Sequence, residues 1–82
     1  DLVIELLSPS TRAFDLTTKR DDYEACGVQE YWAIDSADAR ARCYRRDQDL
    51  LIEVPVRGDT LPSSAMPGLT LDLRPIRALV QR

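Results

Sequence analysis

A glutamate and a lysine near the start of the chain are the residues best suited to chemistry. Glu5 interrupts the aliphatic run Leu-Val-Ile-Glu-Leu-Leu at residues 2–7. A buried carboxylate needs a partner, because burying an unpaired charge is strongly unfavourable, and Lys19 on the next expected element can supply one. Two interpretations stay open at this level: a metal ligand or catalytic acid with its lysine, or a structural ion pair at a sheet end.

Two further polar residues share the expected helix face of Lys19. Asp15, Lys19 and Tyr23 are spaced i, i+4 and i+8, so they line one side of a helix. An Asp–Lys pair at this spacing is also an ordinary helix contact worth roughly 0.2–0.5 kcal/mol. Asp1 falls on the strand face of Glu5, because side chains alternate along a strand. Asp1, Asp15 and Tyr23 are therefore candidate supporting residues.

Composition limits the other possibilities. The 82 residues include no histidine, which excludes Ser-His and Cys-His catalysis and histidine-bound zinc. Cys26 and Cys43 are too few for a disulfide framework and are interpreted as reduced residues of a cytoplasmic protein. No apolar run reaches the roughly 18 residues that span a membrane. The net charge of −3 argues against a protein that coats nucleic acid, but allows a local basic patch.

The elements that must position these residues follow from periodicity and turn signals. Residues 2–7 are predicted to form a strand covered on both faces, as in a central sheet. Residues 8–14 are predicted to be a loop. A helix is expected from Asp15 to Cys26, with Leu16, Tyr23 and Cys26 as its apolar stripe, and Gly27 is expected to end it.

The remainder predicts an antiparallel meander. Strands are expected at 30–35, 40–45 and 50–56, with Pro55 placing the last strand at an edge or ending it. Short extended pieces follow at 60–61 and 69–73, and a short helix at 74–82. The order β-α-β-β-β indicates a single α+β domain, 1–82, with a mixed sheet.

Arginines form one basic cluster on the expected strand 40–45 and just after it. Its members are Arg40, Arg42, Arg45 and Arg46. Arginine commonly contacts nucleic-acid phosphates, so Arg40 and Arg42 are candidate phosphate contacts. A solvated sheet face is the alternative interpretation.

Four segments together resemble the signature of the Uma-type restriction endonucleases, within the PD-(D/E)XK nuclease superfamily. The first, Asp1-Leu-Val-Ile-Glu-Leu-Leu-Ser-Pro-Ser-Thr11, is similar to the family pattern D-L-V-x-E-[VL]-L-S-P-S-T. The others are Asp15-Leu16 with Lys19 and Tyr23; Gly27-Val28, Glu30-Tyr31-Trp32 and Asp35; and Pro67-Gly68-Leu69 with Leu71-Asp72-Leu73. The resemblance covers nearly the whole chain, in the order and spacing of the family.

The resemblance implies a restriction-endonuclease-like fold and hydrolysis of DNA phosphodiesters with Mg²⁺, or alternatively Mn²⁺. It implies that Glu5 is a metal ligand and that Lys19 is a migrated catalytic lysine, because the superfamily's lysine position is Leu7 here. Asp1 lies roughly 13 Å along the strand from Glu5, too far to share a metal ligand shell of about 2.1 Å. The superfamily's second acid lies upstream, so we expect this chain to be the C-terminal portion of a larger endonuclease-like domain.

Two alternatives to a nuclease remain at the level of sequence. One is a nuclease-derived binding or interaction module that is catalytically incomplete. The other is a structural α+β domain in which Glu5 and Lys19 form a buried ion pair.

A strand at 2–7 without an upstream neighbour would present an open sheet edge, which favours pairing with another chain. We therefore predict a homodimer formed through that edge. Small-angle scattering at high protein concentration measures this, and a monomer there would contradict the prediction.

Overall fold

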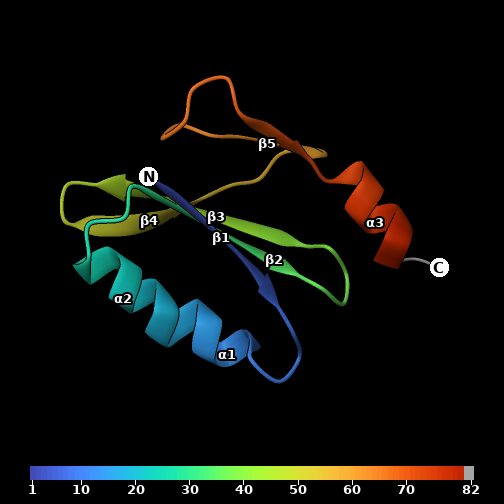
Figure 1. Cartoon of the computed structure of the whole chain (residues 1–82), viewed down its shortest axis with the longest axis horizontal. Coiled ribbons are helices and arrows are strands. Elements are labelled where there is room, and N and C mark those ends of the chain that lie inside the picture. Colours follow the sequence, from blue (N-terminus) through green and yellow to red (C-terminus); the bar gives the residue numbers. More distant parts are fainter. Residues whose placement is uncertain (81–82) are drawn as a thin grey trace.

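A mixed sheet of four strands lies at the centre of the fold (Figure 1). The computed structural model describes residues 1–80. The strands, in spatial order, are β1 (Leu2–Leu7), β2 (Glu30–Asp35), β3 (Ala41–Asp47) and β4 (Leu50–Val54). β1 runs parallel to β2, and the pairs β2–β3 and β3–β4 are antiparallel. The predicted α+β class, mixed sheet and meander are confirmed.

One helical segment follows β1 and covers one face of the sheet. It consists of α1 (Arg12–Phe14), the π-helical turns η1 (Asp15–Lys19) and α2 (Arg20–Ala25). The prediction of a loop through residue 14 is wrong. The carbonyl of Ser8 accepts the N–H groups of both Thr11 (3.1 Å) and Arg12 (2.9 Å), so the chain turns directly into the helix.

The helix ends as the sequence predicts. Gly27 has φ +79°, a left-handed conformation that costs glycine little. The N–H of Val28 then reaches back to the carbonyl of Tyr23 at 3.0 Å, and that of Gly27 to Glu24 at 3.3 Å. This is a Schellman ending. Cys26, expected in the apolar stripe, is instead exposed at the end of the helix, and both cysteines are free.

Two hydrophobic clusters form the core, one on each face of the central sheet. Tyr31 and Ala33 of β2 pack toward the helix, with three residues from the rest of the chain: Leu7, Tyr44 and Leu51. Trp32 and Ile34 face the opposite way and pack with Cys43, Leu61 and Leu73. Alternation along β2 therefore supplies both clusters.

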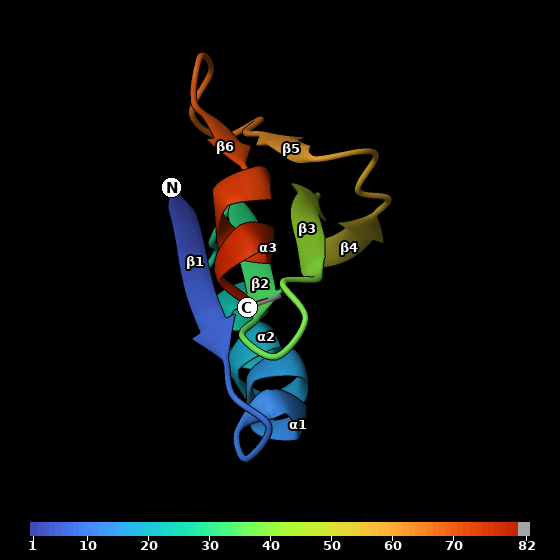
Figure 2. The ribbon, with the colours of Figure 1, turned by 90° about the vertical axis from the view of Figure 1, so that its right-hand side faces the viewer.

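The second cluster is covered by the C-terminal part of the described chain (Figure 2). β5 (Thr60–Pro62) and β6 (Thr70–Asp72) pair as a small antiparallel sheet, and α3 (Arg74–Val80) follows. The extended pieces and the tail helix are thus confirmed, although residues 81–82 of that prediction lie outside the described residues. No helix in residues 1–80 is long and apolar enough to cross a bilayer.

The prediction that residues 2–7 are covered on both faces is wrong. β1 is an outer strand of the sheet, and Ile4 and Leu6 are 48% and 68% exposed. The layer of β5, β6 and α3 contributes to the second cluster, and Leu2 of β1 packs against that cluster. The homodimer through this edge stays a prediction.

A buried carboxylate ties the central sheet to the small sheet. Glu30 has no exposed surface. One carboxylate oxygen accepts hydrogen bonds from Trp32 Nε1 (3.0 Å) and Arg45 Nε (3.2 Å). The other accepts Ser63 Oγ at 2.6 Å and the N–H groups of Ser64 and Ala65. Burial alone would raise the pKa of Glu30, but these donors outweigh it and lower the pKa.

Glu30→Gln should destabilise the fold by about 3 kcal/mol, because it removes the negative charge to which Arg45 and the 63–65 turn donate their hydrogen bonds. The melting temperature should fall by more than about 10 °C for a domain of this size. Because the pKa of Glu30 is lowered on folding, its stabilisation is full above the unfolded pKa and is lost as pH falls through the folded pKa.

Thermal unfolding followed by circular dichroism between pH 7 and pH 3 measures both effects. Glu53→Gln removes the same charge from an exposed position on β4 and serves as the matched control. Equal melting temperatures for the two variants would contradict the role given to Glu30.

Candidate active site

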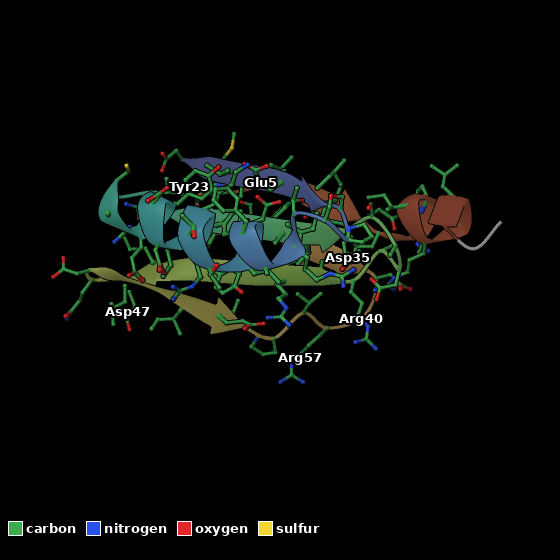
Figure 3. All side chains as sticks on the ribbon, turned by 90° about the horizontal axis from the view of Figure 1, so that it is seen from below. Glu5, Tyr23, Asp35, Arg40, Asp47 and Arg57 are labelled. Carbon is green, nitrogen blue, oxygen red and sulfur yellow. The ribbon has the colours of Figure 1, made fainter. Side chains whose placement is uncertain are left out.

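Glu5 projects from β1 toward the helix, where two side chains hold one of its oxygens. The Tyr23 hydroxyl donates to Glu5 Oε1 at 2.5 Å, and Lys19 Nζ lies 3.5 Å from the same atom. Figure 3 shows Tyr23 and Glu5 side by side, the first on the helix and the second on the strand behind it. Oε2 of Glu5 accepts no hydrogen bond from any residue in the described range 1–80. One carboxylate oxygen is therefore fixed while the other stays available to a ligand.

Lys19 lies between two carboxylates. Its Nζ is 3.5 Å from Glu5 Oε1 and 3.4 Å from Asp15 Oδ1. Desolvation lowers the pKa of Lys19, but its hydrogen bond to Asp15 and the charge of Glu5 outweigh that effect, so the pKa is raised above 10.5. In this arrangement Lys19 is an ammonium group, suited to orient water or contact an anion rather than to accept a proton.

Tyr31 fixes the helix over the strand. Its hydroxyl donates to the backbone carbonyl of Asp15 at 3.1 Å, within η1, and its ring packs against Tyr23 at 5.1 Å between centroids. π-helical turns are rare and often coincide with functional sites, and η1 carries both Asp15 and Lys19. Tyr31 is fully buried, and its role at this site was not predicted from the sequence.

Asp1 does not join this group of residues. Asp1 lies just before the start of β1, four residues before Glu5. Its Oδ1 accepts a hydrogen bond from the backbone N–H of Gln29 at 3.0 Å. Asp1 thus helps to pair β1 with β2. Of the candidates on β1 and the helix, the structure brings together Glu5, Asp15, Lys19 and Tyr23.

The predicted arginine cluster divides into two pairs. Arg45 binds Glu30 and the carbonyl of Pro62. Arg46 donates to the carbonyls of Val28 and Glu24 at 2.8 and 2.7 Å. These two arginines join elements of the fold, and only Arg40 and Arg42 remain as candidate phosphate contacts.

A hollow of about 220 Å³ opens on the helix side of the sheet, and Arg12, Arg40 and Arg42 line it. Arg12 Nε lies 2.6 Å from Asp35 Oδ2, and this pairing lowers the pKa of Asp35. Figure 3 shows Asp35 and Arg40 at the end of the sheet away from Tyr23. Neither Arg12 nor Asp35 was singled out from the sequence, although Asp35 closes the G-V-x-E-Y-W-x-x-D segment.

The carboxylates near Lys19 fit only part of a magnesium site. Mg²⁺ is commonly held by one or two carboxylates, with waters and substrate phosphates completing its six ligands. The available Oε2 of Glu5 suits that role. Within residues 1–80, no three acidic, histidine or cysteine side chains come together as a metal-binding group. Glu5 is therefore a candidate single protein ligand in this chain.

Comparison with protein families gives a match over most of the chain. Residues 1–74 match the Uma2 family model, described as a putative restriction endonuclease. No curated protein matches the chain.

Lys19 is the only lysine in the chain, so its pKa can be measured from a single signal. We predict that the Cε resonance of ¹³C-labelled Lys19 titrates above pH 10.5, and that Glu5→Gln lowers this pKa. The sign follows because the substitution removes the charge that raises the pKa and leaves the desolvation that lowers it.

Glu53→Gln, which removes an equal charge on β4, should leave the Lys19 titration unchanged. An unaltered titration in Glu5→Gln would show that the two groups do not interact in solution.

Proposed function

This chain belongs to the Uma2 family of restriction endonucleases, and from that membership we propose that it supplies Glu5 and Lys19 to the active site of a Mg²⁺-dependent DNA endonuclease. The central mixed sheet with its helix fits the restriction-endonuclease-like fold. The observation that carries the proposal is the asymmetry of Glu5, whose Oε1 is held by Tyr23 and Lys19 while Oε2 is available.

Each residue of the group has a distinct part in the proposed reaction. The bound metal supplies Lewis-acid activation of water and of the phosphodiester. Glu5 presents Oε2 as its ligand, and Tyr23 prevents the carboxylate from rotating because its hydroxyl holds Oε1. Lys19 orients the attacking water through its N–H donors and offsets negative charge that develops on the scissile phosphate.

Asp15 and Tyr31 act on Lys19 rather than on substrate. Asp15 is 4% exposed and, together with Glu5, keeps the ammonium of Lys19 charged. Tyr31 holds the backbone of Asp15. We place both as positioning residues.

A second function is favoured by one specific observation. Asp1 is engaged by the backbone of Gln29, and Asp15 is buried, so Glu5 alone offers an available carboxylate oxygen in this group. This arrangement supports a nuclease-derived module that binds nucleic acid without cutting it. Metal-dependent nicking of DNA separates the two proposals.

We predict that Lys19→Met lowers metal-dependent nicking of supercoiled DNA at least about 100-fold and leaves the circular dichroism spectrum unchanged. Isothermal calorimetry should detect Mg²⁺ or Mn²⁺ binding to the chain and its loss in Glu5→Gln. Asp49→Asn, which removes a negative charge from an exposed residue of the β3–β4 turn, is the matched control for both measurements.

Full nicking by Lys19→Met would refute the role of Lys19. Metal binding without nicking, or no metal binding at all, would favour the non-cutting module.

A further inference from the structure

Two hollows meet at Arg40 and Arg42. The first, of about 220 Å³, lies on the helix side of the sheet. The second, of about 440 Å³, lies beside the start of β3. β4 ends at Val54, opposite Cys43, so the first residues of β3 have no strand beyond them. Arg40 and Arg42 form the shared wall of both hollows.

The fold engages the charges of these two arginines more weakly than those of the other arginines nearby. Arg12 and Arg77, which each line one hollow, are paired with Asp35 and Asp59. Arg42 forms no ion pair with any residue of the described chain. Arg40 reaches only Asp38, at 3.7 Å, and its side chain is 88% exposed.

The side chains that line the two hollows include more positive than negative charges. The second hollow has three arginines, with Arg77 as the third, against one carboxylate, Glu53. The first hollow has three arginines, with Arg12 as the third, against two carboxylates, Asp35 and Asp38. The side chains that line each hollow therefore carry a net positive charge, although the whole chain carries −3.

The first hollow begins next to Glu5. Ala33 lines it and stands opposite Glu5 in the register of β1 and β2. Leu7, two residues after Glu5 on the same strand face, lines it too. From there the arginine wall leads across the start of β3 into the second hollow. The Glu5–Lys19 group and the first hollow thus follow one another on the helix side of the sheet. The second hollow, which Ala41 and Val56 line, opens toward the side of the second cluster.

We propose that Arg40 and Arg42 form a track that binds the sugar–phosphate backbone of a nucleic acid. The bound segment is the part of the nucleic acid next to the phosphodiester bond that lies at Glu5 and Lys19. The position of this segment rests on the proposed function, whereas the binding of backbone phosphates by the two arginines does not. Guanidinium groups suit this role because they donate two parallel hydrogen bonds to phosphate oxygens.

The test is the salt dependence of DNA binding by the 82-residue chain. Fluorescence anisotropy of a labelled 20-base-pair duplex is measured between 50 and 200 mM salt, with EDTA present so that no metal-dependent cleavage occurs. Each phosphate contact contributes about 0.9 to the slope of log K against log salt concentration. Arg42→Ala and Arg40→Ala should each reduce the slope by about that amount, and Arg42→Lys should retain it.

Arg74→Ala is the matched control. It removes one positive charge from an exposed residue outside both hollows, where Arg74 pairs with Asp72, and it should leave the slope unchanged. Circular dichroism checks that each variant is folded.

Three outcomes would overturn the track: no duplex binding by the unaltered chain, equal slopes for Arg42→Ala and Arg74→Ala, or displacement of the duplex by an oligoglutamate peptide of equal charge. Because the measurement is free of metal, Glu5→Gln should bind as tightly as the unaltered chain. The proposed cleavage can therefore fail in the nicking assay while the track stands, and the reverse also holds.

Discussion

The burial of β2 on both faces is the constraint on which the rest of the structure depends. All six of its residues are buried, so each face must be covered by a different layer. Tyr31 on one face fixes the helix through the backbone of Asp15. Glu30 on the other gathers Arg45 and the 63–65 turn around its carboxylate. A strand at the edge could not organise two layers in this way.

The geometry around Glu5 follows from the first of these layers. The aromatic contact between Tyr23 and Tyr31 fixes the position of the helix over the sheet. From this position the side chains of Tyr23 and Lys19 both reach Glu5 Oε1. The same ammonium satisfies Asp15, which is nearly buried. Glu5 can therefore belong to a stable ion-pair network and still bind a ligand, because the network uses only one of its two carboxylate oxygens.

Positive charge is distributed unevenly over an acidic chain. Most arginines near the sheet are bound to carboxylates or carbonyls, as Arg45 and Arg46 are. Arg40 and Arg42 stand apart because β4 ends early and leaves the start of β3 open. Electrostatic attraction of a phosphate backbone depends on such a local surplus rather than on net charge, which reconciles a charge of −3 with a nuclease family.

The sequence by itself determined the α+β order, the meander, the Gly27 helix end and the shared face of Asp15, Lys19 and Tyr23, because these depend on local periodicity and turn chemistry. Only the tertiary structure decided which charges are already used. It placed Asp1 on the backbone of Gln29, Arg45 on Glu30, and β1 at an exposed edge. Such partners lie far apart in sequence, so no local pattern encodes their pairing. For Glu5, the sequence indicated a carboxylate that needs partners, and the fold selected Tyr23 and Lys19 as those partners.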